Sequence, residues 1–308
     1  MIRASIDIGT NSVLLLVADV KSGRLTVLHE EQRIPRLGQG VDESGMLSAA
    51  AQQRVLAVLK DYHALLSSEF NKVVSDTIVT ATSAVRDAAN RSEFLDHIKN
   101  TTGWNVSLLS GEEEAQVTYR GALSVLEKEN QNGRVAVVDI GGGSTEIAFG
   151  REGVLREFIS HNMGSVRFTE RFLKDSPPSG PQVGEALAEA RKLLYGWKER
   201  PAAGTELVGV AGTVTSLAGI DLGLKKYDPA KINGFKVQRS FVETMIDEFR
   251  SLTGDEIEKR YPVFLQGRGE VILGGVLILL ESMKWAECET ITVSTGGIRH
   301  GILLENDH

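Results

Sequence analysis

Two short segments of the chain combine an aspartate, glycines and hydroxyl side chains in a pattern that suits phosphate binding. They are Asp7-Ile8-Gly9-Thr10-Asn11-Ser12 and Asp139-Ile140-Gly141-Gly142-Gly143-Ser144. Each follows a run of strand-forming residues, so each predicts a tight turn whose backbone N–H groups can surround an anion. Glycine lets the backbone approach such a ligand closely. A plain hairpin turn is the alternative for either segment alone, whereas the match between the two favours phosphate binding.

The aspartate in each of these segments predicts a metal ion. A carboxylate does not bind phosphate directly, so Asp7 and Asp139 imply a cation between them and the ligand. Mg²⁺ is the natural choice, because it keeps several waters and is held by one or two carboxylates. The phosphate-binding candidates in the two turns are Gly9, Thr10, Asn11, Ser12, Gly141, Gly142, Gly143 and Ser144.

A cluster of three glutamates marks a predicted helix start in Ser110-Gly111-Glu112-Glu113-Glu114-Ala115. Ser110 and Glu113 have the spacing of a capping box, and Glu112 suits the positive end of the helix dipole. Glu114 has no such task, which makes it the candidate to orient and deprotonate a water molecule. The alternative is an ordinary solvated acidic helix start.

Two further strand-to-helix junctions offer small hydroxyl side chains to an anion. In the segment 80–86, Ser83 and Arg86 can bind phosphate, the alternative being a plain helix cap with a surface arginine. Gly212 and Thr213 lie at a second such junction, where a glycine and a hydroxyl follow a predicted strand, but this signal for phosphate binding is weaker. Arg268-Gly269-Glu270 and the segment 294–299 carry even less signal, and helix capping explains them better than a functional role does.

The elements that must position these residues form two similar series, which indicates an internal repeat at the scale of a domain. Strands are expected at 3–8, 13–20, 24–34, 73–79, 105–109, 135–140, 145–149, 206–210 and 290–294. Helices are expected at 48–69, 91–101, 110–126, 164–173, 182–198, 239–251, 266–283 and from 298.

Length and charge narrow the class of protein. The 308 residues suffice for two domains, and the net charge of −7 argues against a nucleic-acid-binding surface. No apolar run reaches the roughly 18 residues of a membrane span, and the first residues enter a strand pattern rather than a signal peptide. Cys288 is the only cysteine, so neither a disulfide framework nor a zinc cluster is expected, and a reducing cytoplasm fits.

The four segments 7–12, 81–86, 110–115 and 138–146 together resemble the exopolyphosphatase/guanosine pentaphosphate phosphohydrolase (Ppx/GppA) family, in order and in spacing. The resemblance implies an α/β, two-domain actin/sugar-kinase/Hsp70-like fold, a duplicated ribonuclease H-like fold with its active site in the interdomain cleft. The expected domains are 1–120, completed by the helix 298–308, and 121–297. The chain is similar to the short form, without the C-terminal HD-type extension.

The resemblance also implies roles for individual residues. Glu114 matches the proposed catalytic base, while Asp139 and Glu146 match residues linked to catalysis and Mg²⁺, to which Asp7 adds a further carboxylate. Arg86 matches an arginine that contributes to phosphate binding.

The function expected from the resemblance is Mg²⁺-dependent hydrolysis of the terminal phosphate of inorganic polyphosphate. Guanosine pentaphosphate is the alternative substrate, and an actin-fold small-molecule kinase is an alternative from another class, as is a non-catalytic nucleotide sensor. A homodimer is one expected assembly, and neither a nucleic acid nor a membrane is an expected partner.

Overall fold

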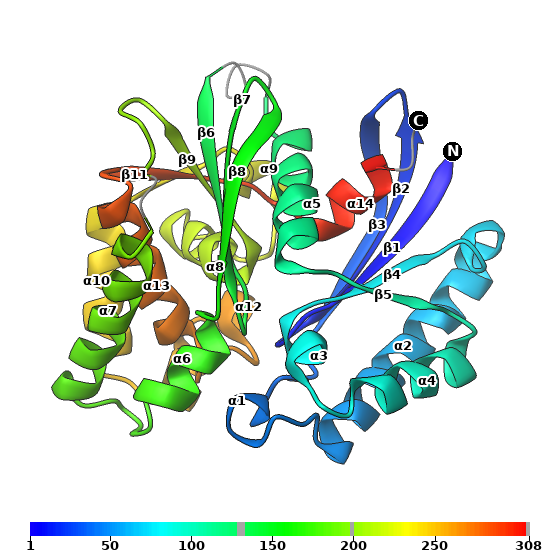
Figure 1. Ribbon diagram of the computed structural model, residues 1–308, viewed down its shortest axis with the longest axis horizontal. Helices are drawn as coiled ribbons and strands as arrows, with labels where there is room; N and C mark the ends of the chain where they lie inside the picture. Colours follow the sequence, from blue (N-terminus) through cyan, green and yellow to red (C-terminus); the bar gives the residue numbers. More distant parts are fainter. Residues whose placement is uncertain (128–132, 198–199, 306–308) are drawn as a thin grey trace. The chain divides into compact units, whose positions relative to one another are not determined.

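The computed structural model describes residues 1–127, 133–197 and 200–305 (Figure 1). The chain divides into two compact units. The first comprises Met1–Ser124 together with the residues from Gly296 onward, and the second comprises Val125–Thr295. Among the described residues, no helix combines the length and the apolar composition that crossing a membrane requires.

The N-terminal unit contains a five-stranded sheet of order β3-β2-β1-β4-β5. β2 pairs antiparallel with both β1 and β3, whereas β4 pairs parallel with both β1 and β5. Its elements are β1 (Ile2–Ile8), β2 (Val13–Lys21), β3 (Arg24–Arg33), α1 (Val41–Ser44), α2 (Ala49–Glu69), η1 (Asn71–Val73), β4 (Ile78–Ala81), α3 (Ser83–Asp87), α4 (Arg91–Thr102), β5 (Val106–Leu108), α5 (Gly111–Ser124) and α14 (Ile298–Glu305).

Alternation along β1 and β2 places apolar side chains on both faces of this sheet. Ile6 and Leu15 belong to a core with α2 and α4, whereas Leu16 belongs to a second cluster with α5 and α14. The helices α5 and α14 cross closely, because a Cβ added at Gly301 would lie only 1.9 Å from the carbonyl oxygen of Val117. The last helix is therefore an integral part of the N-terminal unit.

The C-terminal unit contains a six-stranded sheet of order β10-β11-β9-β6-β7-β8. Its elements are β6 (Arg134–Ile140), β7 (Thr145–Arg151), β8 (Val154–His161), α6 (Ser165–Phe172), α7 (Gly180–Tyr195), β9 (Glu206–Val210), α8 (Ala211–Asp221), α9 (Pro229–Ile232), β10 (Lys236–Gln238), α10 (Arg239–Phe249), α11 (Gly254–Arg260), α12 (Pro262–Leu265), α13 (Ile272–Trp285) and β11 (Thr290–Val293).

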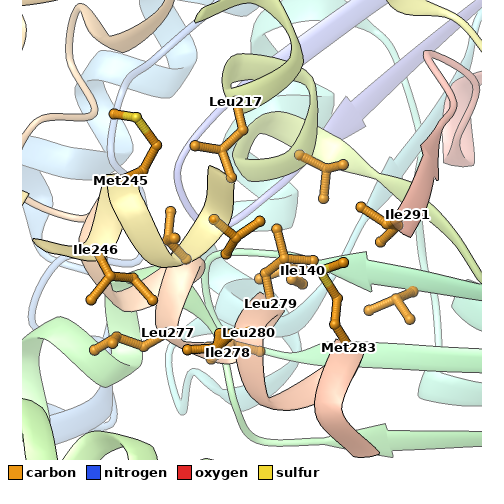
Figure 2. Packing of buried hydrophobic residues seen from close by; sticks show 14 of the residues in the cluster. Ile140, Leu217, Met245, Ile246, Leu277, Ile278, Leu279, Leu280, Met283 and Ile291 are labelled. Atoms are coloured by element: carbon orange, nitrogen blue, oxygen red, sulfur yellow. The ribbon is translucent and has the colours of Figure 1, made fainter. Parts of the chain in front are cut away.

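The core of this unit is built around α13, which is apolar on nearly all sides and almost entirely buried. Figure 2 shows Leu277, Ile278, Leu279 and Leu280 of this helix among side chains from β6, α8, α10 and β11, including Ile140. Such a helix cannot lie at a surface, so it anchors the elements that surround it.

The predicted internal repeat is visible in the topology. The order β3-β2-β1-β4 of the first sheet matches the order β8-β7-β6-β9 of the second. Each sheet also carries an irregularity in register, after Val17 in one and after Phe149 in the other. Val17 is as far beyond Asp7 along the chain as Phe149 is beyond Asp139, so even the bulge occupies an equivalent position in both units.

Two expectations about local structure were wrong, and one strand was missed. The strand predicted at 73–79 begins only at Ile78, where parallel pairing with β1 starts. The helix predicted at 266–283 begins at Ile272, because Gly267 adopts a left-handed backbone (φ 74°) that interrupts any earlier helix. The edge strand β8 was not predicted, since its half-exposed, charged residues lack a regular apolar alternation.

Candidate functional site

The two glycine turns predicted from the sequence have the same local geometry. The N–H of Gly9 donates to the carbonyl of Ser12 at 2.9 Å, and that of Gly141 donates to the carbonyl of Ser144 at 3.0 Å. In each turn, a Cβ added at the glycine would lie 3.1 Å from the carbonyl oxygen that accepts this hydrogen bond. Both turns thus join antiparallel strands with the aspartate just before them, as the sequence predicts.

In the C-terminal unit, groups at the start of α6 donate hydrogen bonds to the carbonyls of the glycine triplet Gly141–Gly143. The donors to these three carbonyls are the N–H of Ser165 at 2.9 Å, the N–H of Val166 at 2.9 Å and the Nε of Arg167 at 2.7 Å. The backbone N–H groups of 142–144 have no acceptor in any described part of the chain. A turn with its carbonyls engaged and its N–H groups available is suited to an anion.

In the turn of the N-terminal unit, the backbone carbonyls also accept hydrogen bonds from a neighbouring segment. The carbonyls of Thr10 and Asn11 accept from the N–H groups of Gly38 at 2.7 Å and Arg36 at 3.0 Å. The side chain of Asn11 is only 6% exposed, and neither its Oδ1 nor its Nδ2 has a partner in the part of the chain that the structure describes. Because a buried amide without partners is costly, Asn11 suits a polar ligand.

In the N-terminal unit, three predicted segments meet at one edge of the sheet, where β1, β4 and β5 end. The N–H of Thr82 donates to the carbonyl of Ile8 at 3.3 Å, and that of Leu109 donates to the carbonyl of Ala81 at 3.0 Å. The turn 9–12, the helix α3 and the start of α5 are therefore neighbours. Asp7 lies one position before this edge on β1, opposite Thr80.

Glu114 differs from the other two glutamates of its helix start. Glu112 and Glu113 are exposed, whereas Glu114 is 5% exposed. The Nη1 of Arg86 donates to Glu114 Oε2 at 2.9 Å and also to the carbonyl of Leu109 at 2.8 Å. A solvated helix start is therefore the wrong description of Glu114, and Arg86 is not a free surface cation. The structure brings these two predicted site residues into direct contact.

The capping box at this helix start is confirmed. The N–H of Ser110 donates to Glu113 Oε2 at 2.8 Å, and the N–H of Glu113 donates to Ser110 Oγ at 3.2 Å. The bond from the Ser110 N–H, together with one from Ser110 Oγ to Glu113 Oε2 at 2.8 Å, holds the pKa of the Glu113 carboxyl below its usual range. Ser83, which was predicted to bind phosphate, is buried, and its hydroxyl donates to Asp87 Oδ2 at 3.4 Å.

The candidate metal-binding carboxylates of the C-terminal unit lie side by side. Asp139 on β6 is directly opposite Glu146 on β7, and both side chains are buried, with 8% and 2% exposure. Mg²⁺ is usually held by one or two protein carboxylates, with water molecules completing its coordination shell. No group of three or more His, Cys, Asp or Glu side chains able to hold a metal occurs in residues 1–127, 133–197 and 200–305. The carboxylate oxygens of Asp139 and Glu146 are donors that suit a hard cation.

Gly212 and Thr213 lie at the corresponding edge of the second sheet, where β9 ends beside Asp139. Ala211 just before them has a left-handed backbone (φ 66°), which is rare for alanine and is often found at functional sites. Gly275 of α13 packs on Thr213, since a Cβ there would lie 2.3 Å from Thr213 Oγ1. The buried helix α13 thus supports this loop.

Arg268 is a candidate that sequence reasoning left without a role. Its guanidinium packs on Gly212, where an added Cβ would lie 2.0 Å from Nη1. Burial lowers the pKa of Arg268 to about 10, so the side chain remains charged at neutral pH. It makes no ion pair or side-chain hydrogen bond with any residue that the structure describes. The only signal in the sequence was its place before the apolar helix α13.

The matched sheets, each with a glycine turn and a carboxylate at the same strand end, define a protein of the actin/sugar-kinase/Hsp70 class. This is the class predicted from the sequence. The chain belongs to the Ppx/GppA phosphatase family, whose model matches residues 16–308. The predicted family is thereby confirmed, and with it the expectation of an enzyme that hydrolyses phosphoanhydrides.

Individual relatives extend this similarity over the whole chain. The chain is 35% identical over 321 residues to exopolyphosphatase 2 of Mycobacterium tuberculosis, covering 98% of this chain and 97% of the relative. It is 30% identical to the guanosine-5'-triphosphate,3'-diphosphate pyrophosphatase of Vibrio atlanticus, but spans only 58% of that protein. The crystal structure of the Aquifex aeolicus member of the Ppx/GppA family superimposes with a TM-score of 0.81 at 34% identity, covering 100% of this chain and 99% of that one.

Proposed function

We propose that this phosphatase is an exopolyphosphatase, which releases the terminal phosphate of inorganic polyphosphate with the help of Mg²⁺. The observation that carries the proposal is the glycine triplet turn, whose carbonyls are bound by α6 and whose N–H groups adjoin the Asp139–Glu146 pair. Phosphoryl transfer depends mainly on positioning and charge stabilisation, and these groups supply both.

The proposed roles are divided between the two units. In the C-terminal unit, Asp139 and Glu146 would hold Mg²⁺, which neutralises charge on phosphate oxygens when it is bound. Arg268 and the loop of Gly212 and Thr213 supply a further cation, hydroxyl and N–H groups in that unit.

In the N-terminal unit, Glu114 orients and deprotonates the attacking water. Arg86 holds the Glu114 carboxylate and binds phosphate, and Asn11 and the N–H groups of its turn bind phosphate oxygens. Asp7 is the carboxylate that this unit offers to a cation.

We propose polyphosphate rather than guanosine pentaphosphate as the substrate because the chain is similar to the exopolyphosphatase relative over a greater part of that relative's length. The chain matches nearly the whole length of the exopolyphosphatase relative, at higher identity than the pyrophosphatase, of which it spans little more than half. The kinase alternative has no support from the family, and a non-catalytic sensor would not require the buried Glu114 and Glu146.

The deciding experiment is phosphate release measured in parallel on polyphosphate, guanosine pentaphosphate and ATP, with Mg²⁺ and with a chelator. We expect the highest kcat/KM on polyphosphate, with loss of turnover on chelation and recovery when Mg²⁺ is restored. A higher kcat/KM on guanosine pentaphosphate would instead establish the alternative substrate. Absence of phosphate release from all three would leave only a binding function.

Removing the Arg86 side chain is expected to weaken the use of polyphosphate. Arg86→Ala deletes a cation that binds phosphate and the donor that Glu114 accepts from, and hydrogen bonds to charged groups contribute about 1.5–3 kcal/mol each. We therefore expect KM for polyphosphate to rise by about tenfold or more, with a smaller fall in kcat. Steady-state kinetics would test this, with Arg24→Ala as a control that removes an exposed cation of the same unit. An unchanged KM would exclude Arg86 from phosphate binding.

A further inference from the structure

Ser160 extends the row of candidate catalytic carboxylates across a third strand. It lies near the end of β8, directly opposite Glu146 on β7, which is itself opposite Asp139 on β6. Residues that are opposite each other in antiparallel strands project from the same face of the sheet. Asp139, Glu146 and Ser160 therefore form one line of neighbouring side chains.

The contact between the last two members of this line is a strong hydrogen bond. Ser160 Oγ donates to Glu146 Oε1 at 2.7 Å, within the range of O–H donors to a carboxylate. Glu146 is 2% exposed, whereas Ser160 is exposed. A buried polar group needs hydrogen-bond partners, and a fixed donor also restricts the rotation of the carboxylate that accepts from it. The hydroxyl thus holds the Glu146 carboxylate in one orientation.

We propose that Ser160 is the positioning residue of Glu146, holding its carboxylate in the orientation that phosphoryl transfer requires. The inference rests on the proposed function, because it takes Glu146 as part of the catalytic and metal-binding set. Partners that orient metal-binding carboxylates typically change metal affinity or activity by about 10–100-fold when removed. Ser160 is also a sensitive test position, since an exposed residue of an edge strand contributes little to folding.

The test compares Ser160→Ala with Ser160→Thr, which keeps the hydroxyl and suits a strand. For Ser160→Ala we expect kcat on polyphosphate to fall by about tenfold, with KM and the melting temperature unchanged. Ser160→Thr should restore most of the lost kcat. The matched control is Ser251→Ala, which removes an exposed hydroxyl that donates to the carbonyl of Glu248, three residues earlier in the chain.

A second measurement needs no turnover. Mn²⁺ binding to the protein without substrate, followed by electron paramagnetic resonance, should weaken by about tenfold in Ser160→Ala and recover in Ser160→Thr. Unchanged kcat and Mn²⁺ affinity in Ser160→Ala would overturn the inference while leaving the proposed function intact. A rise in KM instead of a fall in kcat would also overturn it, because Ser160 would then bind substrate. If the unmodified protein released no phosphate, the proposed function would fail, and Mn²⁺ binding alone would decide the role of Ser160.

Discussion

Replacing Glu114 with glutamine should lower kcat on polyphosphate by at least about 10²-fold while leaving KM nearly unchanged. The amide can still accept the hydrogen bond from Arg86 that the carboxylate receives at 2.9 Å, so the side chain should keep its place. It cannot take a proton from water, however. General-base assistance is typically worth about 10²–10⁴-fold, which sets the size of the expected loss.

The control for this substitution is Glu112→Gln, which removes the same charge two positions earlier in the same helix. Glu112 is exposed and accepts a hydrogen bond from Gln116 on that helix, so its replacement should leave kcat within about twofold. Thermal unfolding of both variants should follow that of the unmodified protein. Near-normal turnover of Glu114→Gln would remove Glu114 from the role of base, and equal losses in both variants would point to a nonspecific charge effect.

Replacing Gly164 with alanine should damage both the stability and the activity of the protein. The added Cβ would lie 2.4 Å from the carbonyl oxygen of Gly142 and 2.6 Å from the carbonyl carbon of Gly143, which are backbone atoms that cannot turn aside. Overpacking of this kind typically costs about 1–3 kcal/mol. Because relief requires the glycine triplet to move, we expect kcat/KM to fall by at least about tenfold, together with the free energy of unfolding.

Gly184→Ala provides the comparison. This glycine lies within α7, where an added Cβ meets nothing within 4 Å, so alanine should be neutral or stabilise the helix by about 0.5–1 kcal/mol. Denaturant unfolding and polyphosphate kinetics measured on both variants would separate crowding of the triplet from the general effect of a methyl group. If Gly164→Ala behaved like Gly184→Ala, the close packing of α6 on the triplet would have no functional importance.

The elements that could be predicted from the sequence are those whose signals are local. The two glycine turns follow apolar strands. The capping box accounts for Glu113 and the helix dipole for Glu112, which leaves Glu114 without a local task. What could not be predicted depends on contacts between distant residues. Arg268 acquires its place only when α13 brings it against Gly212, and Ser160 acquires its partner only through the register of β8 with β7. The edge strand β8 itself carries too few buried residues to be recognised.

The helix α14 connects the last part of the chain to its first strands. Its residue Arg299 donates from Nη1 to the carbonyl of Leu15 at 2.9 Å, and its backbone carbonyl accepts from Ser5 Oγ at 2.9 Å. During synthesis, β1 and β2 therefore leave the ribosome long before the helix that covers one of their faces. The C-terminal unit can complete its core first, while the N-terminal unit must wait for residues made after it. Nascent chains arrested before Ile298 should expose that uncovered sheet face to chaperones, whereas the chain that includes α14 should not.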